Sequence, residues 1–200
     1  MSVQEEINEN TSISKLAVIV SQHLKANGII SVLSGGSVVT IYTDKNFYES
    51  NDLDFISPAN HQKILEVMAQ IGFVKAKSTH KHLTHPNTKI VVEFPTGPVN
   101  LGGAPIRYEH FDEHEIDGGK IRILSPTQSV MDRLLHYIST KDAQGLDQAR
   151  EICERQMVNL SAIEKWSIKE AMASPEQHER IMKTCKEAIA KYNKSQKTNN

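Results

Sequence analysis

The pattern of apolar residues changes character near Pro126, and this change limits the folds open to the chain more than any other feature. Before Pro126, short β-branched runs alternate with segments of helical spacing, whereas after it every apolar pattern has helical spacing. We therefore expect an α+β fold, with a mixed β-sheet flanked by helices over residues 12–125 and a helical part over residues 126–190. Residues 1–11 and 191–200 are polar and without period, which predicts disordered tails.

Individual elements follow from apolar spacing and from turn residues. Helical spacing predicts helices over residues 12–26, 60–72, 127–139, 146–156, 160–172 and 175–192. β-Branched runs predict strands over 29–33, 53–56, 73–76 and 89–94, of which the last two could pair with each other. Asp117-Gly118-Gly119 is a hairpin signal within residues 114–124. The stretch 95–105, which contains Gly and Pro, is expected to be a loop.

Charge and composition exclude several classes of protein. The chain has 23 Lys and Arg against 24 Asp and Glu, so it lacks the basic excess of proteins that coat DNA or RNA. No apolar run approaches the ~20 residues that cross a bilayer, and the acidic, polar N-terminus does not have the form of a signal peptide. We expect a soluble cytoplasmic protein without non-specific DNA binding, in which Cys153 and Cys185 are reduced, partly buried thiols.

Two carboxylates flank one leucine at the start of a predicted strand. Because side chains alternate along a strand, Asp52 and Asp54 point to the same face, with Cα atoms roughly 7 Å apart. Like charges held this close favour a divalent cation, and the hard oxygens of Asp suit Mg²⁺ or Mn²⁺. Glu93 ends another apolar strand, and if the two strands are neighbours, three carboxylates could hold cations for phosphoryl transfer. The alternative is a pair of solvated acids that cap the end of a strand.

A glycine-rich turn follows the strand that precedes these acids. In Ser34-Gly35-Gly36-Ser37, consecutive glycines allow backbone N–H groups to converge on an anion, and the hydroxyl of Ser37 could bond a phosphate oxygen. The turn is therefore a candidate cradle for a triphosphate. Glycine is also common in any sharp turn after a strand, so this motif alone leaves both interpretations open.

These motifs together resemble a known pattern. The chain has, in order, a strand, Gly-Gly-Ser, fourteen further residues, Asp-Leu-Asp-Phe and a later strand with one acidic residue. This order resembles the nucleotidyltransferase superfamily, which includes DNA polymerase β, tRNA nucleotidyltransferases and aminoglycoside nucleotidyltransferases. Within it, the chain looks most like the compact bacterial group related to the AbiEii toxin and the minimal nucleotidyltransferases. The likeness also includes Gly119–Pro126, which leads into a helix, and then Lys141-Asp142 with Asp147.

The resemblance implies a nucleotidyltransferase-like fold and a metal-dependent activity. The phosphates of a nucleoside triphosphate such as ATP would be held by Gly35, Gly36 and Ser37. Asp52 and Asp54 would bind Mg²⁺ or Mn²⁺, and Glu93 would complete the metal site and act as base toward the incoming hydroxyl. The acceptor is left open among a small molecule, an RNA 3′ end and a side chain of a partner protein.

Two other functions remain open beside this enzyme. A nucleotidyltransferase fold could serve as one component of a toxin–antitoxin pair and act mainly by binding a cognate protein partner, since one fold hosts many functions. An unrelated α+β domain with coincidental motifs is the third possibility.

The sequence departs from the family pattern in two places. The gap between Ser37 and Asp52 is long, which implies an extended loop around residues 44–49. Residues 38–43 are β-branched where the family has a helix, so intrinsic propensity and resemblance disagree. We follow the resemblance and expect a helix there, because helix propensity is a weak guide against a matched motif.

Several other side chains have two interpretations each. His80, His82 and His85 could ligate Zn²⁺, but no Cys or firmly placed carboxylate completes a known spacing, which favours an exposed loop where Lys81 or a histidine contacts substrate phosphates. Trp166 is expected in a core, with adenine stacking as the alternative.

Basic side chains later in the chain could add positive charge to a phosphate site. Salt-bridged surface positions are nevertheless the commoner outcome for such residues. The residues concerned are Arg107, Arg122, Arg133 and Lys141, and the candidate pairs are Asp132-Arg133 and Lys141-Asp142.

Overall fold

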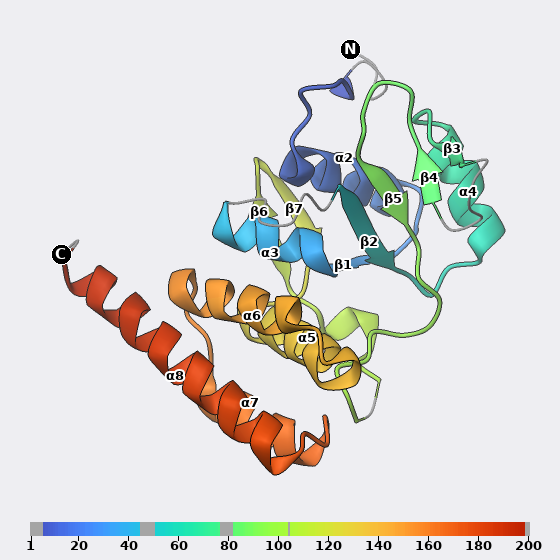
Figure 1. The fold of residues 1–200 in the computed structure, drawn as a ribbon. Coiled ribbons are helices and arrows are strands. Elements are labelled where there is room, and N and C mark those ends of the chain that lie inside the picture. The colour runs from blue at the N-terminus through green and yellow to red at the C-terminus, as the bar shows by residue number, and fades with distance from the viewer. Residues whose placement is uncertain (1–5, 45–50, 77–81, 104, 199–200) are drawn as a thin grey trace. The chain divides into compact units, whose positions relative to one another are not determined.

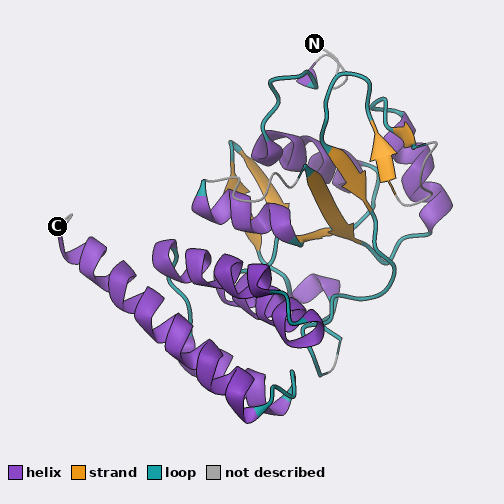
Figure 2. Ribbon diagram, viewed as in Figure 1, coloured by secondary structure: helices purple, strands orange, loops and turns teal. Residues whose placement is uncertain are grey.

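The computed structural model describes residues 6–44, 51–76, 82–103 and 105–198 and divides them into two units. The first unit contains the described residues 6–37, 51–76, 82–99 and 107–123, and the second contains the remaining described residues. Both helices and a mixed sheet are present, which confirms the α+β class (Figures 1 and 2). Residues 38–44, 100–103 and 105–106 group with the helical unit.

A five-stranded sheet forms the centre of the first unit. The strands are β1 (Val32–Ser34), β2 (Asp52–Ile56), β3 (Val74–Lys75), β4 (His82–Thr84) and β5 (Val91–Glu93). Their order in the sheet is β1-β2-β5-β4-β3, with β2 and β5 parallel and the other neighbours antiparallel. Helices α2 (Ile13–Ala26) and α4 (His61–Ala69), the short η1 (Tyr108–His110) and a hairpin of β6 (Glu113–Ile116) and β7 (Gly119–Arg122) complete the unit.

Local signals account for several of these boundaries. Ser12 caps α2 by accepting a hydrogen bond from the Lys15 backbone N–H at 3.1 Å, and the helix ends at the predicted Asn27-Gly28. Asp117 and Gly118 have φ values of 47° and 76°, as a two-residue turn of the type I′ class requires. The first helix and the hairpin are thus confirmed.

The pairing predicted between residues 73–76 and 89–94 is wrong, because β4 lies between β3 and β5. The segment His82–Thr84 alternates polar, apolar and polar residues, and Leu83 is buried opposite Val92 of β5. A strand of three residues is too short for periodicity to reveal, so its burial and pairing decide the structure.

Helix α3 (Gly36–Thr43) resolves the conflict between propensity and resemblance in favour of a helix. Its β-branched residues Val38 and Val39 are buried, so packing outweighs their weak intrinsic preference. The division between the two units falls after Ser37, within this helix.

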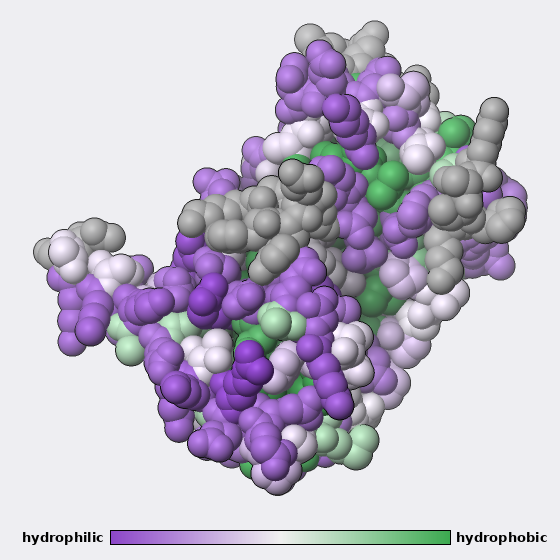
Figure 3. Space-filling model, viewed as in Figure 1, coloured by the Kyte–Doolittle hydropathy of each residue, from purple (hydrophilic) through white to green (hydrophobic). Residues whose placement is uncertain are grey.

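The second unit is built from helices around one apolar cluster. Gly145 allows α6 (Ala143–Arg155) to approach α5 (Pro126–Thr140) closely, because a Cβ there would lie 2.6 Å from the Arg133 carbonyl oxygen. The surface of this unit that Figure 3 shows is largely hydrophilic. Its helices are α5 (Pro126–Thr140), α6 (Ala143–Arg155), α7 (Leu160–Lys169) and α8 (Pro175–Thr198).

The ends of the chain differ in part from the expected disordered tails. Ile7 is buried with only 1% of its surface exposed, and a turn hydrogen bond joins the Thr11 N–H to the Asn8 carbonyl. Helix α8 continues to Thr198, and Lys191 forms an ion pair with Glu154 at 2.7 Å. Residues 1–5 and 199–200 lie outside the described part of the chain. Among the helices described, none is long and apolar enough to cross a membrane.

Candidate active site

The glycine turn links the end of β1 directly to the start of α3. Gly35 has a φ of +78°, and a Cβ built on it would lie 2.1 Å from Oδ2 of Asp54. A residue with a side chain would therefore be strained by its backbone and would collide with the carboxylate. The sequence folds this way because only glycine lets β1 turn into α3 while Asp54 lies against the turn.

Ser37 is completely buried at the first turn of α3. Its hydroxyl donates a hydrogen bond to the Ser34 carbonyl oxygen at 3.4 Å. The hydroxyl thus closes the turn in this structure, while the N–H groups at the start of α3 are those that a helix leaves without intrahelical partners. The predicted phosphate contacts of Gly35, Gly36 and Ser37 stay a prediction.

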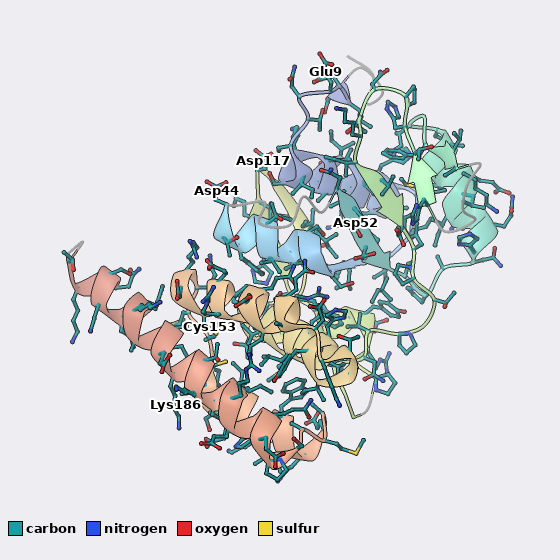
Figure 4. The ribbon with its side chains drawn as sticks, in the orientation of Figure 1. Glu9, Asp44, Asp52, Asp117, Cys153 and Lys186 are labelled. Atoms are coloured by element: carbon teal, nitrogen blue, oxygen red, sulfur yellow. The ribbon has the colours of Figure 1, made fainter. Side chains whose placement is uncertain are left out.

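The two aspartates share one face of β2, as the alternation of the strand predicts. Leu53 and Phe55 are fully buried, whereas Asp52 and Asp54 are half-buried on the opposite face. Figure 4 labels Asp52 on this strand. The apolar residues on the other face hold both carboxylates in place.

A row of polar residues crosses four neighbouring strands at the same level. Ser34 pairs with Asp54, Asp54 with Glu93, and Glu93 with His82, so these four residues form one line from β1 to β4, the polar row. The condition on which the three-carboxylate hypothesis depended, that the strands of Glu93 and of the aspartates are neighbours, is met. Parallel neighbours are about 4.8 Å apart, so Asp54 and Glu93 start from adjacent backbone positions.

His82 is the member of the polar row whose place the sequence did not reveal. Its Nε2 lies 2.6 Å from Oε1 of Glu93, and the two side chains are 37% and 20% exposed. The prediction of a His-rich loop therefore does not hold for His82, which is in a strand. The alternation of His82, Leu83 and Thr84 is too short a signal to have found it.

The donor chemistry of the row suits a divalent cation, but the side chains do not form a complete metal site. Within the described ranges, no group of three or more His, Cys, Asp or Glu side chains is placed to hold a metal ion. Asp52 and Asp54 supply hard oxygens from one face, and the carboxylate of Glu93 contacts His82. The register places Glu93 beside Asp54, and the metal-binding role of Asp52, Asp54 and Glu93 stays a prediction.

The histidine nearest in sequence has a structural role. His85 is buried, its ring lies 5.1 Å from the Phe73 ring, and its Nδ1 accepts from the Asn87 N–H at 3.2 Å. Burial lowers the pKa of His85, against the smaller opposing effect of a hydrogen bond with the Ile71 backbone. His85 is therefore a core residue and not part of an exposed loop, while His80 and Lys81 lie outside the described residues.

The basic residues singled out from the sequence are mostly engaged with acids. Arg133 bonds to Asp132 at 2.5 Å, which confirms that candidate pair, and also contacts Gln148. Lys141 instead caps the end of α5 with a φ of 61°, and Asp142 caps the start of α6. Arg107 pairs with Glu109, and Arg122 with Glu113.

Trp166 and the two cysteines belong to the core of the helical unit. The indole N–H of Trp166 donates to the Leu101 carbonyl, and the ring is buried, as packing predicts. Cys153, labelled in Figure 4, and Cys185 are free, buried thiols. The pKa of the Cys153 thiol is raised, mainly by the hydrogen bond with Cys185 and next by burial.

No protein-family model matches the chain, and no match was found among curated proteins. Among solved structures, the chain is similar to an antigenic nucleotidyltransferase-like protein from Paracoccidioides brasiliensis. The TM-score is 0.50 and the identity 14%, over 74% of this chain and 78% of that chain. The antibiotic-resistance factor ANT(2'')-Ia also matches, with a TM-score of 0.45 and 10% identity over 90% of this chain and 94% of that chain. At 14% identity the first similarity establishes the fold alone, which is nucleotidyltransferase-like.

Proposed function

We propose that the protein is a metal-dependent nucleotidyltransferase. It binds a nucleoside triphosphate such as ATP together with Mg²⁺ or Mn²⁺ and transfers the nucleoside monophosphate to an acceptor hydroxyl. The observation that carries this proposal is the close approach of Asp54 to the glycine turn. Asp54 lies against Gly35, and Glu93 is the register partner of Asp54 on the next strand.

The glycine turn would bind the phosphates mainly through its backbone. The N–H groups of Gly36 and Ser37 begin α3, where the partial positive charge of a helix attracts an anion. Because the Ser37 hydroxyl donates to the Ser34 carbonyl, its contribution is to hold the turn closed. A triphosphate on this turn would lie beside the carboxylate of Asp54.

The acidic residues would then divide the work of the transfer. The acceptor oxygen attacks the α-phosphorus, the bond to the bridging oxygen of the β-phosphate breaks, and pyrophosphate leaves. Glu93 would take the proton of the acceptor hydroxyl. General-base catalysis of this kind commonly raises the reaction rate by about 10²- to 10⁴-fold. Asp52 and Asp54 would hold the divalent cations, which supply neutralisation of the phosphate charge.

The alternative of a binding module predicts a large apolar patch on the C-terminal helices. The exposed large apolar side chains described in the helical unit are Met157, Ile168 and Met172. Apolar residues exposed singly are normal on protein surfaces. The polar row is the more specific feature, so the enzyme is the function proposed.

The test is calorimetric titration of Mg²⁺ and a non-hydrolysable ATP analogue into the wild type and a double variant, Asp52→Asn with Asp54→Asn. The amides keep the shape and remove the charge, so Mg²⁺-dependent nucleotide binding should be lost. A matched control, Asp112→Asn with Glu115→Gln, removes two charges from exposed positions of the same unit and should bind like the wild type. Failure of the folded wild type to bind any of the four nucleotides with Mg²⁺ would refute the proposal.

A further inference from the structure

Glu93 lies in the sheet between a carboxylate and an imidazole. Its register partner on β2 is Asp54 and its register partner on β4 is His82. One position along each strand, Leu53 pairs with Val92, and Val92 pairs with Leu83. All three apolar side chains are buried. The three polar side chains therefore share the other face of the sheet.

The contact between Glu93 and His82 is short and sheltered. Nε2 of His82 lies 2.6 Å from Oε1 of Glu93, which is close enough for a strong hydrogen bond between the imidazole and the carboxylate. Only 20% of the Glu93 side chain is exposed, which reduces the competition from water. This bond occupies one of the two carboxylate oxygens and fixes the orientation of the other.

Asp54 and Glu93 would repel each other as adjacent carboxylates without such a partner. A donor on the far side of Glu93 offsets this repulsion and limits the rotamers of the glutamate. Carboxylates that bind cations commonly have outer hydrogen-bond partners of this kind, and loss of such a partner weakens metal binding.

We infer that His82 is a positioning residue of the candidate active site, which holds Oε1 of Glu93 and leaves Oε2 as the oxygen that acts in the reaction. This inference rests on the proposed function, since it gives Glu93 a role toward cation and acceptor. His82 acts through Glu93 and itself needs no contact with the nucleotide.

The position allows substitution without damage to the core. Leu83 provides the buried contact of β4, whereas His82 points to the opposite face with 37% of its side chain exposed. His82→Phe keeps a ring and removes the donor. His82→Gln places an amide N–H close to the position of Nε2. The side chain of His82→Asn is shorter, so its amide N–H does not reach that position.

The first experiment measures the Mg²⁺ concentration needed for half-maximal binding of a non-hydrolysable ATP analogue. His82→Phe and His82→Asn should raise this concentration by about tenfold or more, and His82→Gln should return it to within about threefold of the wild type. His61→Gln, an exposed histidine in the same unit, is the control and should have no effect. The inference would be overturned if His82→Phe needed the same Mg²⁺ concentration as the wild type or a lower one. It would also be overturned if His82→Gln were as impaired as His82→Asn.

The second experiment needs no nucleotide. The ring nitrogens of His82 in the wild type, observed by ¹⁵N NMR at neutral pH, should show a protonated, hydrogen-bonded Nε2 whose signal shifts in Glu93→Gln. Normal nucleotide binding with an unprotonated Nε2 would overturn the role of His82 alone. A wild type that shows the hydrogen bond but no Mg²⁺-dependent nucleotide binding would instead overturn the proposed function, and with it the catalytic meaning of the contact.

Discussion

Replacement of Gly35 by alanine tests whether the glycine turn and the acidic strand form one structure. The added Cβ would lie 2.1 Å from Oδ2, 3.0 Å from Cγ and 3.2 Å from Cβ of Asp54. The φ of +78° adds a second cost, because an alanine rarely adopts this conformation. Both effects favour a local rearrangement that separates the turn from the carboxylate.

The two costs can be separated with a matched glycine. Gly28 has a φ of +71° and nothing within 4 Å of a built Cβ, so Gly28→Ala reports the backbone cost alone, about 1 kcal/mol. Gly35→Ala adds the overlap with Asp54, which overpacking data put at about 1–3 kcal/mol. We therefore expect Gly35→Ala to lower the free energy of unfolding by about 2–4 kcal/mol, clearly more than Gly28→Ala.

The assay is urea denaturation followed by far-UV circular dichroism, with a double-mutant cycle. Asp54→Ala removes the atoms at 2.1 Å and 3.0 Å and keeps only the Cβ, so Gly35→Ala in that background should cost little more than Gly28→Ala. Equal costs for the two glycines, or a Gly35→Ala cost that Asp54→Ala leaves unchanged, would show that the contact does not exist.

Two further predictions concern stability. Burial lowers the pKa of His85 from its ordinary value of 6.5, so the unfolded chain takes up a proton before the folded one as the pH falls. The contribution of neutral His85 to the stability of the fold is therefore complete above pH 6.5 and is lost as the pH falls toward the lower pKa of the folded state. The urea midpoints at pH 7.5 and pH 5 should differ less in His85→Gln than in the wild type. An equal difference in the two proteins would contradict the lowered pKa of His85. Ser125→Ala removes the capping box that the Ser125 and Gln128 side chains make at the start of α5 and should cost about 1 kcal/mol in the same assay. The exposed Ser161→Ala within α7 should cost nothing measurable, and an equal loss in both would contradict the role of the cap.

Features that depend on neighbouring residues in the chain could be predicted from the sequence. The cap at Ser12, the stop at Asn27-Gly28 and the turn at Asp117-Gly118 each follow from the conformational preferences of one to three residues. The common face of Asp52 and Asp54 follows from strand alternation in the same way. Helix α3 was predictable only from the resemblance, because its β-branched residues favour a strand.

Features that depend on distant residues could not be predicted. The strand β4 has three residues and is fixed by pairing with both β3 and β5. The segment around Leu101 lies with the helical unit because Trp166, which is 65 positions away, donates to its carbonyl and Gly102 packs against the Glu170 backbone. The hydrogen bond between His82 and Glu93 has the same origin, since neither residue carries a local sign of the other.

The position of the acidic residues is ultimately set by the apolar face of the sheet. Leu53, Val92 and Leu83 are buried together, and a slip of one residue between β2 and β5 would turn these side chains to the other face. The burial of these residues therefore fixes the register, and the register in turn places Asp54, Glu93 and His82 side by side. A substitution such as Val92→Ala, on the buried face of the sheet, would act on the polar row through this register, whereas the Asn and Gln variants of the row change its charge without disturbing the core.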